Sequence, residues 1–452
     1  AAELVAAYRS RALSPVEVTR AFLDRIDVLD GQLHAFVTAL PDQAVAQASA
    51  AERAYARGGV LPPLLGVPVS IKDAFHVKGV PTTLGSLVHQ GHVAKVDSGV
   101  VRRLRAAGCV FTGKTNTAEF GQSATTDNLL GPDTGNPWDP GRTPGGSSGG
   151  AAASVAAGLS TLAAGSDGGG SIRIPAAFTG LYGFKASPGL CPDEKGFRGM
   201  TDFVSPGPLA RRVADARTML GVLADRELRR RPVPGPLRIG YCARPEGRPV
   251  DPGVADAVGK AASALERLGH AVIETPLPIE GWQDVFGPLV LDDEHRERGH
   301  LLAAPEQLTR YERATLRAAA RQDPRDIQRA QASLPAYRQR IDALFDTYDV
   351  LLTPTTAVAA FPLGERPARI AGVGVDPLWG AFPFAVPFNV AGAPAASLPC
   401  GLAAGLPVGA QLVTRAGAEA LLLDVSEQLE EALQFDLGPL VRRWARQRAA
   451  TG

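Results

Sequence analysis

Gly145-Gly146-Ser147-Ser148-Gly149-Gly150 is the first of two glycine-rich turns in this sequence, and Gly165-Ser166-Asp167-Gly168-Gly169-Gly170-Ser171-Ile172-Arg173 is the second. The alanine-rich apolar run Ala151–Ala164 separates them. Glycines at this density let a ligand approach the backbone closely. They also allow successive N–H groups to converge on one point, as an oxyanion hole requires. A serine in such a turn is therefore a candidate nucleophile.

The composition narrows the class of protein. The chain has 452 residues and a formal net charge of +1, from 47 basic and 46 acidic residues. A balanced charge gives no reason to expect nucleic acid or an anionic membrane as a partner. No signal-peptide segment and no apolar run of about 18 residues occurs, which predicts a cytoplasmic protein without a membrane span. Four widely spaced cysteines and no H-E-x-x-H motif predict free thiols and no metal or other cofactor.

The pattern of elements indicates an α/β protein. Leu65–Asp73 reads as a short buried strand that ends near Lys72. Further along, Leu237–Tyr241, Val254–Leu268 and His270–Ile273 read as strand, amphipathic helix and strand. This β-α-β order predicts the α/β class.

Other segments are less clear from the sequence. Leu159–Ala164 fits either a helix or a strand, as short apolar runs do. Pro324 and Pro335 are expected to interrupt the charged helical region that contains them. We expect one domain over residues 1–452, with about 215–350 as a peripheral lobe that contributes to the substrate pocket.

A serine nucleophile needs a base, and Lys72 is the best candidate. Neither serine turn matches G-x-S-x-G, and the seven histidines lie in no motif that indicates a base. The apolar run Val67–Ile71 is expected to carry Lys72 into the interior, where desolvation lowers the pKa of a lysine toward neutrality. The alternative is a lysine at a strand end whose ammonium reaches solvent.

Together these pieces resemble the amidase signature family. The resemblance covers most of the first half of the chain and part of the last quarter. It is carried by Lys72 with its strand, Gly113–Phe120, Gly145–Gly150, Gly165–Phe184 and Pro387–Leu412. It implies an α/β amidase signature fold, in which a large mixed central sheet is covered by helices on both faces.

The resemblance also implies a Ser-Ser-Lys catalytic triad. Ser171 would be the nucleophile, and Ser147, on a cis peptide after Gly146, would relay its proton to neutral Lys72. The N–H groups of Gly168, Gly169, Gly170 and Ser171 would bind the oxyanion. The Lys72–Ser147 relay would then protonate the leaving amine.

Two further groups of residues border this centre. Asp167 and Arg173 flank the nucleophile, and we expect them to hold the loop as an ion pair rather than to bind substrate. By resemblance, the polar loop that begins with Gly121, Gln122 and Thr125 borders the acyl pocket, with the Gly121 carbonyl near the substrate. Ordinary loop hydrogen bonds are the alternative for each side chain.

Two other functions fit the sequence less well. Gly108–Thr115 fits the P-loop pattern G-x-x-x-x-G-K-[ST], but a helix rather than a strand is expected before Gly108, and a strand between the glycines. Nucleotide binding is therefore disfavoured. A non-catalytic scaffold would have lost Lys72, Ser147 or Ser171, and all three are present.

The substrate class follows from the resemblance and from aromatic residues. The C-terminal segment Pro387–Pro399 looks more like stand-alone bacterial amidases, such as aryl acylamidases, nylon-oligomer hydrolases and urethanases, than like a tRNA-linked amidotransferase. We therefore expect a small-molecule amide or carbamate as substrate, and leave a homodimer open. Aromatic side chains expected in the pocket walls are Trp282, Phe286, Trp379, Phe382 and Phe384, and a place in the core is the alternative for each one alone.

Overall fold

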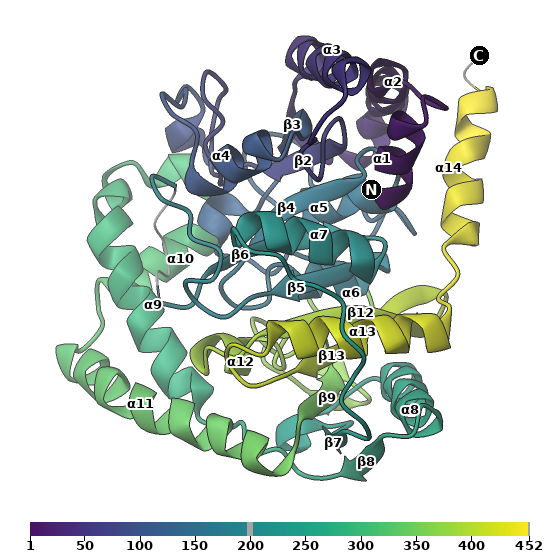
Figure 1. Ribbon diagram of the computed structural model, residues 1–452. Coiled ribbons are helices and arrows are strands. Elements are labelled where there is room, and N and C mark those ends of the chain that lie inside the picture. The colour runs from purple at the N-terminus through teal and green to yellow at the C-terminus, as the bar shows by residue number, and fades with distance from the viewer. Residues whose placement is uncertain (197–201, 451–452) are drawn as a thin grey trace.

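A large mixed β-sheet forms the centre of the molecule. The computed structural model describes residues 1–196 and 202–450. Within these residues an 11-stranded sheet runs in the order β1-β3-β2-β4-β6-β5-β12-β13-β9-β7-β8 (Figure 1). The strand pairs β2–β3, β2–β4, β7–β8 and β7–β9 are parallel, and the other pairs are antiparallel. This architecture confirms the α/β fold expected from the sequence.

The strands and helices have the following bounds. The strands are β1 (Phe36–Ala39), β2 (Pro68–Lys72), β3 (Val110–Thr115), β4 (Leu162–Asp167), β5 (Tyr182–Lys185), β6 (Ser205–Ala210), β7 (Arg238–Tyr241), β8 (Ala271–Glu274), β9 (Val350–Pro354), β12 (Ala395–Ala403) and β13 (Leu406–Val413), with a separate hairpin of β10 (Arg369–Ile370) and β11 (Val373–Gly374). The α-helices are α1 (Ala2–Arg9), α2 (Pro15–Leu33), α3 (Pro41–Arg57), α4 (Gly99–Ala106), α5 (Gly149–Ala156), α6 (Arg173–Thr179), α7 (Val213–Leu223), α8 (Pro252–Arg267), α9 (Trp282–Arg298), α10 (Arg310–Ala319), α11 (Pro324–Thr347), α12 (Val386–Val390), α13 (Glu419–Leu433) and α14 (Gly438–Ala450).

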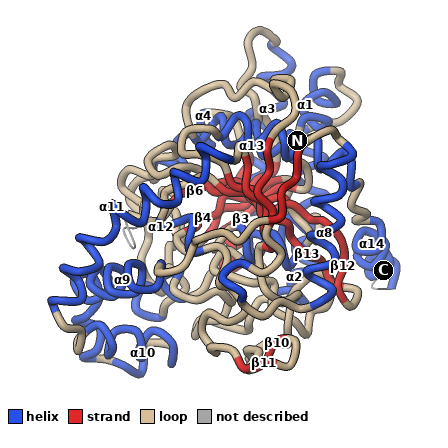
Figure 2. Tube along the Cα trace, turned by 90° about the horizontal axis from the view of Figure 1, so that it is seen from below, coloured by secondary structure: helices blue, strands red, loops and turns tan. Residues whose placement is uncertain are grey.

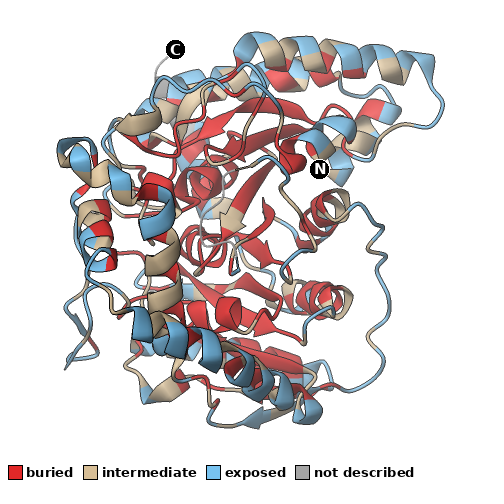
Figure 3. Cartoon of the chain, turned by 90° about the vertical axis from the view of Figure 1, so that its left-hand side faces the viewer, coloured by how far each residue is buried: buried red, intermediate tan, exposed pale blue. Residues whose placement is uncertain are grey.

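Helices cover both faces of the sheet. Alternate side chains of a strand point to opposite faces, and here the apolar side chains on both faces are buried under helices. In β4, Leu162 and Ala164 belong to a buried cluster with α4, α7, α8 and α13. Ala163, between them, belongs to a cluster with α5 and α6. Figure 2 shows the strands gathered in the middle with helices around them, and Figure 3 shows buried residues concentrated there and exposed ones along the outer helices.

Three neighbouring parallel strands define the edge at which the site is built. β2 is parallel to β3 on one side and to β4 on the other. Their carboxyl ends, Lys72, Thr115 and Asp167, therefore lie along one edge of the sheet. Ligands of α/β proteins bind at such an edge, beyond the carboxyl ends of the strands.

The structure resolves the segments that the sequence leaves unclear. Leu159–Ala164 contributes to a strand, since β4 begins at Leu162. Pro324 begins α11, where its missing N–H costs nothing, but the expectation that Pro335 interrupts the region is wrong, because Pro335 lies inside α11. The sequence does not predict the long strand β12, because Pro399 and Gly401 interrupt the pattern of residues that is typical of a strand.

The region 215–350 divides into two parts in space. β7, β8 and α8 belong to the central sheet and its cover. Helix α9 packs against both α10 and α11 to one side of the sheet (Figure 1). Among the described residues, no helix combines the length and apolar character needed to span a membrane.

Candidate active site

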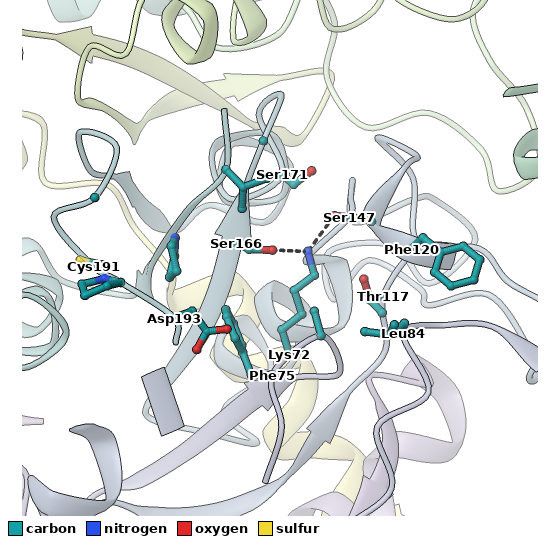
Figure 4. A pocket seen from close by; sticks show the side chains of 17 residues that line it. Lys72, Phe75, Leu84, Thr117, Phe120, Ser147, Ser166, Ser171, Cys191 and Asp193 are labelled. Carbon is teal, nitrogen blue, oxygen red and sulfur yellow. Dashed lines mark hydrogen bonds between the residues drawn. The ribbon is translucent and has the colours of Figure 1, made fainter. Parts of the chain in front are cut away.

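Lys72 lies at the end of β2 and is almost completely buried. The five residues of β2 are all buried, so the strand delivers the lysine to the interior. Its Nζ donates to Ser147 Oγ at 2.7 Å and to Ser166 Oγ at 3.0 Å (Figure 4). Burial lowers the pKa of Lys72 to about 7, although the Asp167 carboxylate acts in the opposite direction. An appreciable fraction of Lys72 is therefore neutral at physiological pH, as a base must be.

The first glycine turn fixes Ser147 against Lys72. The Gly146–Ser147 peptide bond is cis. A Cβ on Gly146 would lie 2.5 Å from the carbonyl oxygen of Thr125, so only glycine fits there. Thr126 Oγ1 donates to the Gly145 carbonyl at 2.8 Å and accepts from Gly149 N–H at 3.0 Å. These contacts brace the turn from the neighbouring loop.

The second turn holds Ser171 on the wall of the same cavity. Ser171 lies just beyond the carboxyl end of β4, and its hydroxyl makes no hydrogen bond with the described residues. The N–H groups of Gly168, Gly169 and Ser171 also have no hydrogen-bond acceptor among those residues. The expectation for Gly170 is contradicted, because its N–H donates to Asp167 Oδ1 at 2.8 Å. Three of the four expected oxyanion donors are therefore open.

Asp167 and Arg173 form a fully buried ion pair. Arg173 Nη2 lies 2.8 Å from Asp167 Oδ1, and Asn389 Nδ2 donates to the same carboxylate at 2.9 Å. Despite burial, these contacts hold the pKa of Asp167 well below its usual range, with the Arg173 charge as the strongest lowering influence. Because the carboxylate also accepts from the N–H groups of Gly170 and Ile172, the pair shapes the Ser171 turn from behind.

Two adjoining cavities meet at Ser171. The first, of about 220 Å³, is lined by Lys72, Ser147 and Ser166 among others, and is called the lysine cavity here. The second, of about 290 Å³, is called the aromatic pocket and is lined by Trp282, Phe286 and Trp379 with apolar neighbours from α9. Ser171 and Gly121 line both.

The expected aromatic walls are confirmed only in part. Trp282, Phe286 and Trp379 pack edge-to-face, with ring centroids 5.7 to 6.4 Å apart. Phe382 and Phe384 do not line the pocket, because they are buried in other apolar clusters. Sequence alone does not separate these cases, since all five are aromatic residues in apolar surroundings.

The loop after Gly121 is only partly at the site. Gly121 lies beside Ser147, since a Cβ on it would be 3.4 Å from Ser147 Oγ. Gln122 lines the aromatic pocket, with its Nε2 bonded to Glu294 of α9. The expectation for Thr125 is wrong, because its side chain turns away and donates to Asp127 at 2.6 Å. Thr125 lines a separate surface hollow.

Lys114, the lysine of the P-loop-like pattern, is not available to bind phosphate. It lies within β3, is fully buried, and its Nζ is 2.5 Å from Asp73 Oδ1. The residues between Gly108 and Lys114 belong mostly to this strand, with α4 before them. Residues 108–115 thus do not form the exposed phosphate-binding turn that a P-loop requires.

Some residues at the site carry no signal in the sequence. Ser166 belongs to the second glycine turn, but its contact with Lys72 depends on β2 and β4 being neighbours. Glu294 lies 172 positions from Gln122 in the chain. Among the described residues, no group of three or more His, Cys, Asp or Glu side chains could hold a metal ion.

These features define an α/β protein with a lysine–serine cluster and open N–H groups at the carboxyl edge of parallel strands. Comparison with known proteins gives the family. The family model Amidase matches residues 17–423. The chain is 36% identical to indoleacetamide hydrolase of Bradyrhizobium diazoefficiens, over 95% of this chain and 86% of that one. It is 35% identical to a glutamyl-tRNA(Gln) amidotransferase subunit of Moorella thermoacetica, over 94% of each.

Solved structures agree with this assignment. A bacterial aryl acylamidase of the amidase signature family has a TM-score of 0.88 at 30% identity, covering 99% of this chain and 97% of that one. A 6-aminohexanoate cyclic dimer hydrolase has a TM-score of 0.86 at 29% identity, covering 98% of each. The chain belongs to the amidase signature family and is a hydrolase of carbon–nitrogen bonds.

Proposed function

We propose that this chain is a stand-alone amidase that cleaves uncharged aromatic or apolar amides, or the corresponding carbamates, through an acyl-enzyme on Ser171. One observation carries the proposal. A buried lysine of lowered pKa contacts Ser147 in a cavity that adjoins an aromatic pocket, and Ser171 lies where the two meet. The similarity to an aryl acylamidase and to an indoleacetamide hydrolase supports an aromatic substrate.

The first half of the reaction forms the acyl-enzyme. Ser171 Oγ attacks the carbonyl carbon and loses its proton to Ser147 Oγ, while the Ser147 proton passes to neutral Lys72 Nζ. The carbonyl oxygen becomes an oxyanion that accepts hydrogen bonds from the open N–H groups of the second turn, at Gly168, Gly169 and Ser171. Preorganised donors of this kind are worth about 3 to 4 kcal/mol each when removed.

The second half releases the two products. Lys72 returns its proton through Ser147 to the amide nitrogen, the C–N bond breaks, and the amine leaves. Water then adds to the Ser171 ester with the same relay as base, and the product departs as a carboxylic acid from an amide or as a carbonic acid half-ester from a carbamate. Because Lys72 and Ser147 line only the lysine cavity, the amine is expected on that side and the acyl group in the aromatic pocket.

The lining of the aromatic pocket favours a substrate with an uncharged acyl group. It disfavours glutamine, the substrate that a tRNA-linked amidotransferase would use. None of the described residues lining the aromatic pocket carries a full charge, and its walls are mainly aromatic and aliphatic. The ammonium and carboxylate of an amino acid would be desolvated there without partners of opposite charge, at a cost of several kcal/mol. An aromatic ring would instead be buried against Trp282, Phe286 and Trp379.

The experiment is a labelling and turnover assay. A phosphonofluoridate should attach one phosphonyl group to each wild-type chain, and mass spectrometry should find it on the peptide that contains Ser171. Ser171→Ala should prevent the addition and lower hydrolysis of aromatic anilides by about 10⁴-fold or more. Ser160→Ala is the matched control, because Ser160 is also buried but bonds to Thr112 away from the cavity. Labelling or turnover that survives Ser171→Ala would disprove the assignment.

A further inference from the structure

A hydrogen bond joins the loop beside Ser147 to the helix that forms the aromatic pocket. Gln122 Nε2 donates to Glu294 Oε1. Gln122 follows Gly121, which lies beside Ser147, whereas Glu294 lies on α9 together with Trp282 and Phe286. The contact therefore connects two sides of the proposed acyl pocket.

Glu294 is held in place by charge. It is completely buried and pairs with Arg298 one helical turn further along α9. Arg298 also reaches Glu312 of α10, with 3.3 Å between Nε and Oε1, and lies over the Phe120 ring at 4.6 Å. A buried carboxylate with this support is a fixed acceptor.

A fixed acceptor determines how the Gln122 amide is turned. A carboxylate accepts but does not donate, so the nitrogen of the amide must face Glu294. The amide oxygen of Gln122 then faces away from the Glu294 carboxylate, and it makes no hydrogen bond with the described residues. Gln122 lines the aromatic pocket, and this oxygen is the atom of its amide that is left without a partner among those residues.

Other polar side chains of the pocket already have partners or lie at its rim. The Ser123 hydroxyl is engaged by Thr125 at 2.8 Å and by Arg366 at 2.8 Å. Tyr311 and Gln283 are only half-buried. An acceptor in an otherwise apolar pocket selects orientation and specificity.

We propose that Gln122 is a specificity-determining residue whose amide oxygen accepts a hydrogen bond from an O–H or N–H on the substrate's aromatic acyl group, and that Glu294 is the positioning residue that turns the amide for this purpose. The inference rests on the proposed function for its assignment of the acyl group to the aromatic pocket. The preferred substrates are amides whose aromatic acyl ring carries a hydrogen-bond donor.

The test uses arylacetamides that differ in one ring substituent. The substituent, at the meta or para position, is a hydroxyl group, which can donate a hydrogen bond, a methoxy group, which can only accept one, or a methyl group, which can do neither. Dissociation constants are measured by calorimetry with Ser171→Ala protein, which binds without turnover. The better hydroxyl isomer should bind roughly 3- to 10-fold more tightly than its methoxy and methyl analogues, as one neutral hydrogen bond provides.

Variants test whether Gln122 acts through the hydrogen bond of its amide oxygen, and whether Glu294 orients that amide or only packs in the interior. Gln122→Met, in the Ser171→Ala background, should make the three affinities equal. Glu294→Gln can accept or donate, so the Gln122 amide is no longer held one way and the hydroxyl preference should fall. Glu312→Gln is the matched control, because it alters another carboxylate that contacts Arg298 but does not touch Gln122. It should retain the preference even where its melting temperature falls.

Equal affinities for all substituents in the parent protein, or a preference that survives Gln122→Met, would overturn the inference. If Glu294→Gln does not fold, the comparison with Gln122→Met still decides whether the hydroxyl preference depends on Gln122. Wild-type turnover of the same amides is measured separately. Its absence would count against the proposed function, whereas turnover without a hydroxyl preference would count against the role of Gln122 alone.

Discussion

Lys72 and Lys114 lie on neighbouring parallel strands and are equally buried, but they have different partners. Within the described part of the chain, Lys72 on β2 hydrogen-bonds only to the hydroxyls of Ser147 and Ser166. Lys114, on β3, contacts the Asp73 carboxylate at 2.5 Å and also donates to Thr82 at 3.1 Å. Burial lowers the pKa of both, and for Lys114 the adjacent Asp73 charge opposes that shift most directly.

The difference shows that depth alone does not make a lysine a base. Desolvation penalises the ammonium at both positions, but at Lys114 an ion pair compensates for it. At Lys72 the nearby hydroxyl oxygens stabilise the charge much less, so the proton is easily released. We therefore propose a chemical role for Lys72 and a structural role for Lys114.

The largest effect is expected for Lys72→Met. Removing the proposed base should lower kcat by about 10² to 10⁴-fold while the fold is retained, because the Lys72 ammonium bonds to hydroxyls and its loss leaves no paired carboxylate behind among the described residues. Steady-state kinetics on an aromatic anilide, with the melting temperature measured in parallel, tests this. Loss of folding instead of turnover would mean that Lys72 resembles Lys114 after all.

Lys114→Met should act on stability. Removing one member of a buried ion pair costs about 3 to 5 kcal/mol, because Asp73 is left buried without its counter-charge. Denaturant unfolding measures the loss. Adding Asp73→Asn should recover much of it, since the amide oxygen can still accept from Thr83 N–H without carrying a charge. A variant as stable as wild type would show that the pair contributes nothing.

The pH dependence should follow Lys72. Below its pKa of about 7 the lysine is protonated and cannot act as a base, so kcat/KM should fall about tenfold per pH unit on the acid side. The stability of the folded chain should also increase with pH. Between about 7 and the ordinary value of 10.5, the unfolded chain binds more protons than the folded one, so the free energy of unfolding rises with pH. A pH–rate profile without an acid limb near 7 would contradict this prediction.

The smallest effect is expected for Ser166→Ala. The Ser166 hydroxyl accepts from Lys72 and thereby favours the ammonium form. Without it, kcat/KM should change only a few-fold, as for one lost neutral hydrogen bond, and the acid limb should move to lower pH. The midpoint of the pH–rate profile is the measurement. A loss as large as for Lys72→Met would place Ser166 in the proton path itself.

Much of the fold and part of the site can be predicted from the sequence. The pattern predicts β7, α8 and β8 within one or two residues, because their apolar periodicity is strong and their ends carry clear signals. The contacts of Ser166 and Glu294 and the engaged N–H of Gly170 cannot be found in this way. Their roles depend on contacts between strands and helices whose spacing in the chain carries no local pattern.

What the sequence determined by itself was a set of residue types in local order: two serines in glycine turns, and a lysine after a buried strand. Glycine, apolar runs and helix caps act over a few residues, so they can be recognised without the fold. Only the tertiary structure decided which partner each lysine has and which N–H groups remain open. These depend on strand order, because β2 lies between β3 and β4 and brings Lys72 within hydrogen-bonding distance of Ser166 and Ser147, residues 94 and 75 positions away.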